Sequence, residues 1–216
     1  MDTLIRDILI LIFYSLDFKD KINLYKTSKK YDFVLSCITY IPNKFMGNII
    51  DDNITNLTNI TKLNLCHIKV ITDKGIKNLT NLTNLNLIYN NVITDNGIKN
   101  LINIIHLNLE DNKNITDDGI KNLTNITKLN LWGDNIITNN GIKNLTNITY
   151  LDLYDNKVIT DNGVKYLTNI TELYLGDNKN ITDEGIKHLS NITKLDLYCN
   201  YKITNDGIKH LYKLNN

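Results

Sequence analysis

The side chains of this sequence that could do chemistry recur at a spacing of 22 residues. His188 and His210 are one such interval apart, so successive turns of a repeating structure would bring the two imidazoles together. Two histidines without a third ligand make a poor metal site, because zinc centres take three or four protein ligands. No nucleophile-elbow, phosphate-loop, dinucleotide-binding or zinc-protease motif is present. We therefore predict no catalytic residues, no metal site, and no cofactor or small-molecule substrate.

Lysine recurs at the same interval and could form a phosphate-binding stripe. The members of this lysine stripe are Lys77, Lys99, Lys121, Lys143, Lys165, Lys187 and Lys209. Five of the seven follow an aspartate by four residues, as Lys77 follows Asp73, which predicts salt bridges on a helix. The chain has 24 basic and 23 acidic residues, a formal net charge of +1. We interpret the stripe as a solvated, salt-bridged face and expect neither nucleic acid nor a membrane as partner.

Aromatic and acidic side chains gather next to regularly spaced leucines in the second half of the chain. They are Trp132, Tyr150, Asp152, Tyr154, Glu172, Tyr174, Asp196 and Tyr198. One interpretation is that the aromatic residues only reflect the preference of β-strands for them. The other is an interface, because tryptophan and tyrosine dominate binding energies between proteins. We predict a surface for a protein target, where the carboxylates favour a basic partner and Gly176, between Tyr154 and Tyr198, leaves a shallow notch.

The elements that would position these residues follow from the repeat itself. Glycine recurs every 22 residues from Gly75 to Gly207 without an insertion, and leucine keeps the same interval from Leu57 to Leu211. Each unit reads L-x-x-I-x-x-L-x-L-x-x-N-x-x-I-T-D-x-G-I-K-x. This unit resembles the leucine-rich repeat, whose L-x-x-L-x-L-x-x-N phrase forms one coil of a solenoid. The resemblance implies an α/β fold of stacked coils with a parallel β-sheet on the concave face.

Each column of the repeat has a predicted role. Leu129 and Leu131 are two residues apart, so both point from a short strand into the core. An asparagine such as Asn112 closes the strand, where its amide can satisfy backbone groups as the chain bends away. Thr72 caps a short helix or turn. The glycine column marks either close approach of neighbouring coils or a backbone angle that other residues resist.

The residues before the repeats have a different pattern. Apolar residues recur at helical spacing near the N-terminus, and Pro42, the only proline, marks a boundary. We predict a small helical segment at residues 1–45 and the solenoid at residues 46–216. The apolar run Ile8 to Tyr14 is too short to cross a bilayer and has no cleavage site after it. The three cysteines are odd in number and far apart, which predicts no disulfide framework. Together these observations favour a cytoplasmic protein, with the nucleus as an alternative, that is not secreted.

Leu4 to Tyr31 resembles an F-box, whose pattern is L-P-x-E-I-L-x-x-I-F-x-x-L…D-L…L…C-K-R-W. The matching residues are Leu4, Asp7, Ile8, Ile12, Phe13, Leu16, Asp20, Leu24, Ser28, Lys29, Lys30 and Tyr31. Ile5 stands where proline is usual, and Tyr31 where tryptophan is commoner. The I-T-D-x-G-I phrase also resembles the repeats of F-box/leucine-rich-repeat proteins, which are usually longer and carry cysteine where this chain has asparagine.

The two resemblances together imply a substrate adaptor of a cullin-RING ubiquitin ligase. The F-box-like segment would dock a Skp-type adaptor, and through it a cullin, while the solenoid holds the target. The residues that this implies for the contact are Leu4, Ile8, Ile12, Leu16 and Leu24. The alternative is a plain leucine-rich-repeat scaffold whose N-terminal helices only cap the first coil.

Overall fold

The computed structural model describes residues 16–17, 19–21, 23, 39–42, 46, 49–133 and 135–214. Most of the predicted F-box-like contact falls outside these residues, namely Leu4, Ile8, Ile12 and Leu24. Leu16 is described and is half-buried in a bend. The helical segment and the division at residue 45 therefore stay predictions.

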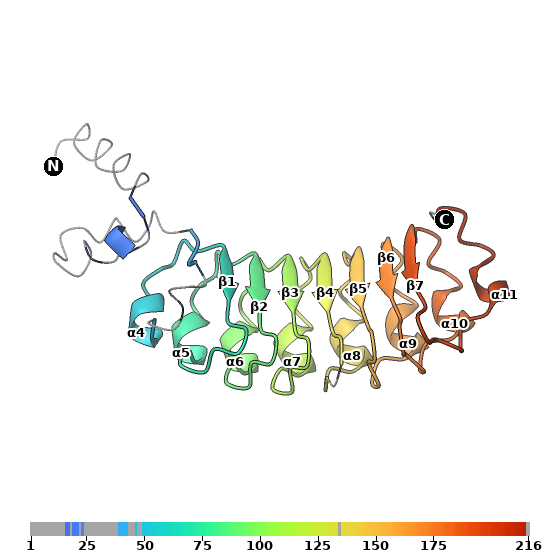
Figure 1. Ribbon diagram of the computed structural model, residues 1–216, viewed down its shortest axis with the longest axis horizontal. Coiled ribbons are helices and arrows are strands. Elements are labelled where there is room, and N and C mark those ends of the chain that lie inside the picture. The colour runs from blue at the N-terminus through green and yellow to red at the C-terminus, as the bar shows by residue number, and fades with distance from the viewer. Residues whose placement is uncertain are drawn as a thin grey trace.

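Within the described residues, seven three-residue strands form one parallel sheet in which each strand pairs with the next along the chain (Figure 1). They are β1 (Lys62–Asn64), β2 (Asn84–Asn86), β3 (His106–Asn108), β4 (Lys128–Asn130), β5 (Tyr150–Asp152), β6 (Glu172–Tyr174) and β7 (Lys194–Asp196). The register advances by one repeat, so Leu129 lies beside Leu107 and Leu151.

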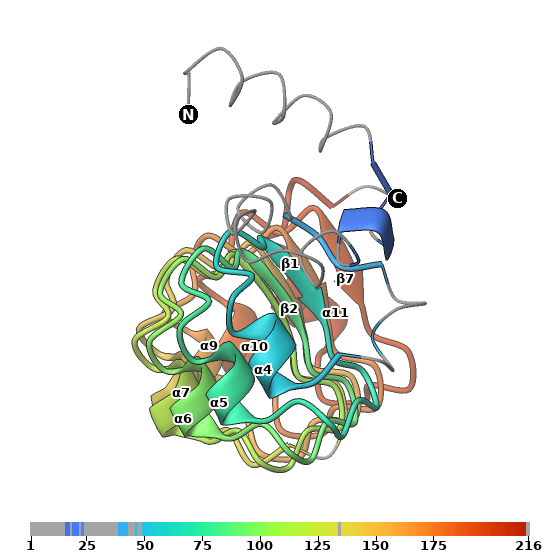
Figure 2. The same cartoon turned by 90° about the vertical axis from the view of Figure 1, so that its left-hand side faces the viewer.

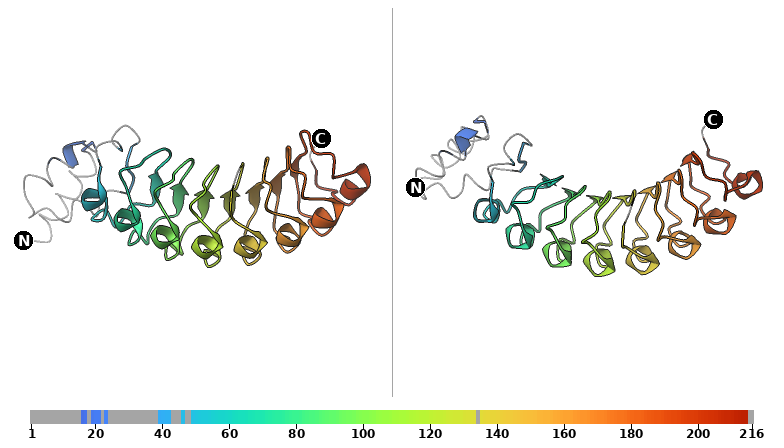
Figure 3. Two further views of the ribbon diagram at one scale, coloured as in Figure 1. Left: turned by 90° about the horizontal axis from the view of Figure 1, so that it is seen from below. Right: turned by 60° about the horizontal axis from the view of Figure 1, so that its bottom comes forward.

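In the part of the chain that the structure describes, eight four-residue helical turns lie on the side of the row opposite the strands, one before β1 and one after each strand. These turns are α4 (Asp51–Ile54), α5 (Asp73–Ile76), α6 (Asp95–Ile98), α7 (Asp117–Ile120), α8 (Asn139–Ile142), α9 (Asp161–Val164), α10 (Asp183–Ile186) and α11 (Asn205–Ile208). The coils lie nearly behind one another in the view along the row (Figure 2). The row curves, with its strands on the concave side and its helical turns on the convex side (Figure 3). The predicted leucine-rich-repeat solenoid is confirmed.

The interior of the solenoid is built from apolar columns that run the length of the row. In the coil of β4, Ile126, Leu129, Leu131, Ile137 and Ile142 are all 0% exposed. Full burial of one such side chain contributes roughly 1.5–3 kcal/mol. The coils of β1 to β6 supply buried residues at the same positions, and together they form one continuous core cluster, against which the partly buried Leu195 and Leu197 of the β7 coil pack. The coils are therefore stable as a row, because each covers the open face of its neighbour.

A buried asparagine ladder closes the strands. Asn112 Nδ2 donates to the carbonyl oxygens of Leu87 at 3.2 Å and Asn90 at 2.7 Å, both in the preceding coil. Its Oδ1 accepts from the backbone N–H groups of Asn114 and Ile115, each at 3.0 Å. One amide thus satisfies four backbone groups that would otherwise be buried without partners. The predicted role of this column is confirmed.

One residue per coil, just before the ladder, has a positive φ. The non-glycine residues at this position are His67, Tyr89, Asp111, Asp155, Asp177 and Cys199, with φ between 47° and 57°. In the coil of β4 the position is taken by Gly133, with φ 80°. The ladder is also displaced there, since the buried amide belongs to Asn135, which donates to Trp132 O at 3.2 Å but whose Oδ1 has no partner within the described part of the chain.

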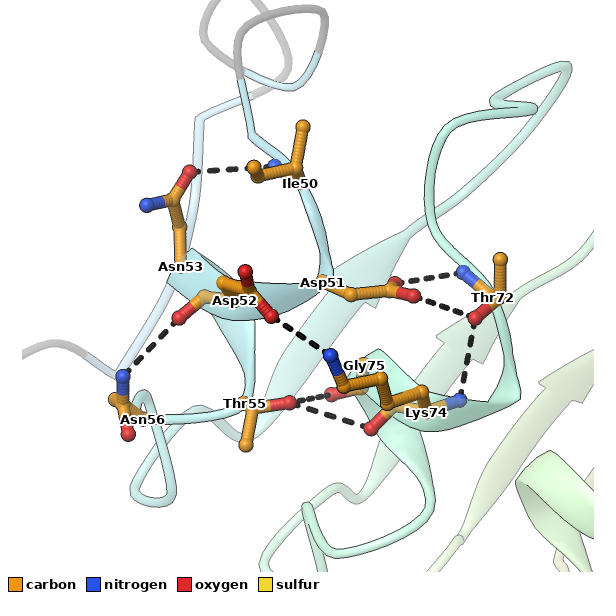
Figure 4. Close-up of polar contacts among 9 residues, drawn as sticks. All are labelled: Ile50, Asp51, Asp52, Asn53, Thr55, Asn56, Thr72, Lys74 and Gly75. Atoms are coloured by element: carbon orange, nitrogen blue, oxygen red, sulfur yellow. Dashed lines mark hydrogen bonds and ion pairs between the residues drawn. The ribbon is translucent and has the colours of Figure 1, made fainter.

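From α4 to α10, the first residue of each helical turn binds the threonine at the N-cap position of the next turn. Asp95 Oδ1 accepts from Thr116 N at 2.8 Å, and its Oδ2 accepts from Thr116 Oγ1 at 2.6 Å. The same hydroxyl caps α7 by accepting from Asp118 N at 3.2 Å. Figure 4 shows the first of these Asp–Thr bridges, between Asp51 and Thr72. The predicted capping role of Thr72 is confirmed, because it accepts from Lys74 N at 3.3 Å.

These bridges explain the glycine column. A methyl group on Gly119 would lie 2.4 Å from Asp95 Oδ1, far inside van der Waals contact. The same is true from Gly75 to Gly207, and Gly133 is the sole described glycine with a positive φ. Of the two explanations that the sequence left open for this column, close approach of neighbouring coils is the one observed.

The same bridges make the predicted Asp–Lys pairs wrong. Asp73 binds Thr94 of the next coil and is occupied there. Lysines of the stripe instead contact the residue three positions earlier, as Lys121 contacts Asp118 at 2.6 Å and Lys99 contacts Asn96 Oδ1 at 2.8 Å. The Lys121–Asp118 ion pair and the Lys99–Asn96 hydrogen bond are both exposed, so each contributes little to stability.

An incomplete coil precedes β1. Tyr40 forms a parallel bridge with Lys62, and Thr61 N donates to Thr39 O at 2.9 Å. Ile41 and Met46 are 1% and 2% exposed and belong to the same core cluster as the repeats. Residues 39–42, which include the predicted boundary proline, are therefore continuous with the solenoid.

Candidate functional site on the concave face

Three columns of side chains flank the strand leucines and point away from the core. The first column is Lys62, Asn84, His106, Lys128, Tyr150, Glu172 and Lys194. The second column is Asn64, Asn86, Asn108, Asn130, Asp152, Tyr174 and Asp196. The third column is Cys66, Ile88, Glu110, Trp132, Tyr154, Gly176 and Tyr198. The residues of the first and second columns belong to the strands, and those of the third column follow the strands directly. The sheet therefore positions the side chains of all three columns.

The predicted aromatic residues meet in pairs along this face. The rings of Trp132 and Tyr154 have centroids 5.2 Å apart at 59°, and those of Tyr150 and Tyr174 are 5.2 Å apart at 43°. Such tilted arrangements are favourable for aromatic pairs. Trp132 is 41% exposed and Tyr198 is 65% exposed. The structure thus brings these side chains together on β4 to β7 and leaves two of them open to a partner.

The predicted notch at Gly176 is wrong. A Cβ atom on Gly176 would lie 2.3 Å from Tyr154 Cε2, so the Tyr154 ring already occupies the space above this glycine. The phenol of Tyr154 donates to Asp177 Oδ2 at 3.0 Å, which fixes the ring in place. This hydrogen bond, followed by partial burial, raises the pKa of Tyr154 to about 12. Tyr154 is therefore a structural support for Trp132 as well as a surface residue.

The carboxylates of the predicted site lie between the rings. Asp152 Oδ1 and Asp196 Oδ1 each accept from the backbone N–H two residues later, at 3.0 Å and 2.8 Å. Burial, together with the charge of Asp196, raises the pKa of Asp152. Glu172 Oε2 accepts from the hydroxyl of Tyr174 at 3.1 Å. The patch is acidic, and two lysines lie over its rings: Lys194 is 5.1 Å from the centre of the Tyr174 ring, and Lys128, at its edge, is 5.9 Å from that of Tyr150.

A hollow of about 340 Å³ lies over β1 to β4, at residues of which only Tyr150 belongs to the predicted site. The polar and aromatic side chains that line it are Tyr40, Lys62, Asn64, Asn84, Asn86, His106, Asn108, Lys128, Asn130 and Tyr150. Burial and the charges of Lys128 and Lys62 lower the pKa of His106. The sequence does contain a sign of this hollow, because lysine, asparagine and histidine precede the leucines in the first column of the first four coils. The prediction placed the site on the later coils because the aromatic residues gather there.

A larger hollow, of about 940 Å³, follows the asparagine and threonine rows at the start of the strands. Its amides are already engaged, since Asn125 Nδ2 donates to Ile102 O at 2.9 Å and Asn147 Nδ2 donates to Thr124 O at 2.9 Å. Thr149 Oγ1 likewise donates to Thr127 O at 3.2 Å. We interpret these hydrogen bonds as structural links between neighbouring coils. Because the polar groups of this groove are already used in these links, the strand face is the better candidate site.

The remaining candidates lie away from the concave columns. His210 Nε2 contacts Ile186 O at 3.1 Å, and Cys66 and Cys199 are half-buried free thiols. Among the residues that the structure describes, no three His, Cys, Asp or Glu side chains gather as metal ligands. None of the described helices has the length and apolar character needed to cross a bilayer.

Comparison with known proteins agrees with the geometry of the coils. Residues 78–102, 100–124, 144–167 and 166–190 match the family described as "Leucine Rich repeat". The crystal structure of internalin C2 from Listeria monocytogenes is similar, with 30% sequence identity and a TM-score of 0.70 over 85% of this chain and 81% of that chain. The chain belongs to the leucine-rich-repeat family.

A second similar structure is that of the Toll–Spätzle complex of Drosophila, at 18% identity and a TM-score of 0.51, over 67% of this chain and 21% of that one. At that identity the likeness concerns the fold alone. No curated protein matches the sequence. The family matches skip residues 125–143, which include the coil where the ladder asparagine of this leucine-rich-repeat protein is displaced to Asn135.

Proposed function

We propose that this leucine-rich-repeat protein binds a protein target on its concave face, through the patch centred on Trp132. The observation that carries this is the exposure of paired aromatic rings on a sheet whose core does not need them. Trp132 is 41% exposed although large apolar side chains gain by burial. The patch carries three carboxylates, Asp152, Glu172 and Asp196, against Lys194, and so suits a basic segment of the target. The Toll–Spätzle structure is itself a complex, and binding scaffolds are what this family typically provides.

Replacing Trp132 tests the proposal. Trp132→Ala should weaken target binding by about 2 kcal/mol or more, roughly 30-fold, because aromatic anchors dominate such interfaces. The melting temperature should change little, since the side chain does not belong to the core. The measurement is affinity capture of the target by the full chain, followed by titration of the identified target. Lys121→Ala and Lys143→Ala on the convex side are the matched controls and should bind normally. Loss of binding in the lysine variants but not in Trp132→Ala would place the site elsewhere.

The finer proposal is that the protein is a target-recognition adaptor of a cullin-RING ubiquitin ligase, in the cytoplasm or nucleus. In that proposal residues 1–45 dock a Skp-type adaptor and residues 46–216 hold the target. Its support is the F-box-like pattern of Leu4 to Tyr31. The second candidate is a plain scaffold with N-terminal helices as a cap, and the burial of Ile41 and Met46 beside the first coil is compatible with it.

One pair of variants separates the two candidates. In the adaptor, Leu16→Asp and Leu24→Asp should abolish co-purification with a Skp-type adaptor and leave the melting temperature unchanged. In the capped scaffold, the same changes should lower the melting temperature, and the unmodified chain should bring down no Skp or cullin from a competent lysate. Target binding through Trp132 is expected in both.

A further inference from the structure

We propose that the hollow over β1 to β4 binds an acidic peptide segment of the protein target, so that the concave face reads its partner at two oppositely charged places. The proposal rests on the proposed function, because it concerns the same face and the same partner. The hollow has a volume of about 340 Å³, and none of the side chains that line it is acidic. The nearest carboxylates on this face, Glu110 and Asp152, lie outside the lining.

The two lysines of the hollow provide its positive charge. Lys62 and Lys128 are exposed, and within the described residues neither forms a salt bridge, whereas Lys74, Lys121 and Lys209 do. The nearest interaction of Lys128 is with the face of the Tyr150 ring, 5.9 Å from its centroid. In the first two columns no carboxylate lies between these lysines, and the nearest one, Glu110 in the third column, accepts from Asn130 Nδ2 at 3.5 Å. Two cations in one column attract an anion more strongly than either would alone.

The asparagines of the second column present hydrogen-bond donors to the same space. Asn86 Oδ1 accepts from Ile88 N and Asn108 Oδ1 accepts from Glu110 N, each at 3.0 Å. Because an acceptor must face these backbone N–H groups, the orientation of both amides is determined and their NH₂ groups are directed away from these groups. The equivalent NH₂ group of Asn130 reaches a carboxylate, Glu110 Oε2 in the preceding coil, at 3.5 Å. Adjacent strands are about 4.8 Å apart, so one carboxylate can accept from both amides.

His106 lies between the lysines and reports on the charge of the hollow. Its Nδ1 is 2.8 Å from Asn84 Nδ2. Burial and the charges of Lys128 and Lys62 lower the pKa of His106, which favours the neutral ring in the free protein. The other titratable groups that line the hollow are Tyr40 and Tyr150. A bound carboxylate would favour the imidazolium, and the pKa of His106 would rise.

A peptide fits this surface better than a nucleic acid does. Arg6 is the only arginine of the whole chain, and arginine is the usual donor for repeated phosphates. Glu110 at one edge and Asp152 at another would repel a long polyanion, while a short acidic segment ends before reaching them. Over β5 to β7 the charges reverse, since Asp152, Glu172 and Asp196 face Lys194 alone. The two halves together fix the direction in which a target lies along the row.

The test uses the full chain and three probes: the peptides acetyl-Glu₄-amide and acetyl-Gln₄-amide, and inorganic phosphate. Binding is followed by NMR through the His106 ring signals and the side-chain amides of Asn86 and Asn108. The glutamate peptide should shift these signals and raise the pKa of His106, and the effect should weaken as salt is added. The glutamine peptide and phosphate should bind at least several-fold more weakly.

The variant for this test is Lys62→Gln with Lys128→Gln, which should weaken binding of the glutamate peptide about fivefold or more, as expected for two exposed ion pairs. Both side chains are exposed, and an unchanged melting temperature verifies folding. Lys121→Gln with Lys143→Gln is the matched control and should bind as the unmodified chain does. Equal binding by the Lys62 and Lys128 variant, equal binding of the glutamine peptide, or equal binding of phosphate would each overturn the proposal.

The outcome is separable from that of the proposed function. If the target itself binds normally to the Lys62 and Lys128 variant but is lost with Trp132→Ala, the protein-binding function stands and the acidic-segment inference fails. If Trp132→Ala and the lysine variant both bind the target normally, the concave face is not the site and the proposed function fails.

Discussion

Asn139 provides a direct test of what the Asp–Thr bridges contribute to the row. Where the other coils that form this bridge have aspartate, Asn139 Oδ1 accepts from Thr160 N at 3.0 Å, and its Nδ2 donates to Thr160 Oγ1 at 2.8 Å. In this second contact the threonine hydroxyl accepts the hydrogen bond, whereas in the other bridges it donates one to the aspartate. Thr160 is also a capping threonine without a side-chain cap hydrogen bond, whereas Thr116 and Thr182 have one. We expect Asn139→Asp to stabilise the protein.

The size of the gain follows from two terms. Restoring the cap on α9 contributes about 1 kcal/mol. Making two hydrogen bonds charge-assisted adds roughly 0.5–1 kcal/mol each, from which the partial desolvation of a half-buried carboxylate must be subtracted. The net gain in the free energy of unfolding should be about 1–2 kcal/mol. The reverse change, Asp95→Asn in a complete bridge, should cost about the same amount.

Urea unfolding followed by circular dichroism measures the global effect. Hydrogen exchange of the Asn162 amide, the group that Thr160 would cap in α9, measures the local one, which matters because repeat arrays need not unfold in one step. Slower exchange at Asn162 together with a higher urea midpoint is the expected result. If Asn139→Asp is neutral or destabilising while Asp95→Asn is neutral, the bridges do not hold the convex side together and this reasoning is refuted.

Two further predictions concern the ladder and the aromatic patch. Asn112→Ala should cost about 2–4 kcal/mol in urea unfolding because it leaves four buried backbone groups unpaired, and Asn200→Ala, at a site that is 9% exposed, should cost less; equal losses would contradict a continuous buried ladder. Burial raises the pKa of Tyr150 to about 12. In the unfolded chain tyrosine loses its proton near pH 10. The stabilisation is therefore intact below pH 10 and is lost as the pH rises through 12. Tyr150→Phe should flatten this alkaline fall in the free energy of unfolding.

The sequence predicted those features that depend on the period alone. Leu129 and Leu131 point inward because two residues separate them on a strand, and Asn112 and Gly119 act between coils because each recurs once per coil. The Asp95–Thr116 bridge was missed because its partners are 21 residues apart, one short of the repeat, so only the stacking of real coils brings them together. The notch at Gly176 was predicted wrongly for a related reason. Aligning the repeats predicts where each Cβ atom lies, but it does not predict the side-chain rotamer that places the Tyr154 ring over the next coil.

The left-handed residue that precedes the ladder has a consequence for altering what this solenoid binds. His67, Tyr89, Asp111 and the three later residues hold a conformation that costs a non-glycine residue roughly 1–2 kcal/mol, while Gly133 adopts it freely. Asp177 should be kept, because its carboxylate holds the Tyr154 ring. Glycine at the other five positions would lose part of the gain through its greater freedom in the unfolded chain. The remaining stability, spread over the row, would tolerate disruptive changes on the strand face. A chain with relaxed turns is therefore the natural parent for a library in which the three concave columns are randomised and new targets are selected.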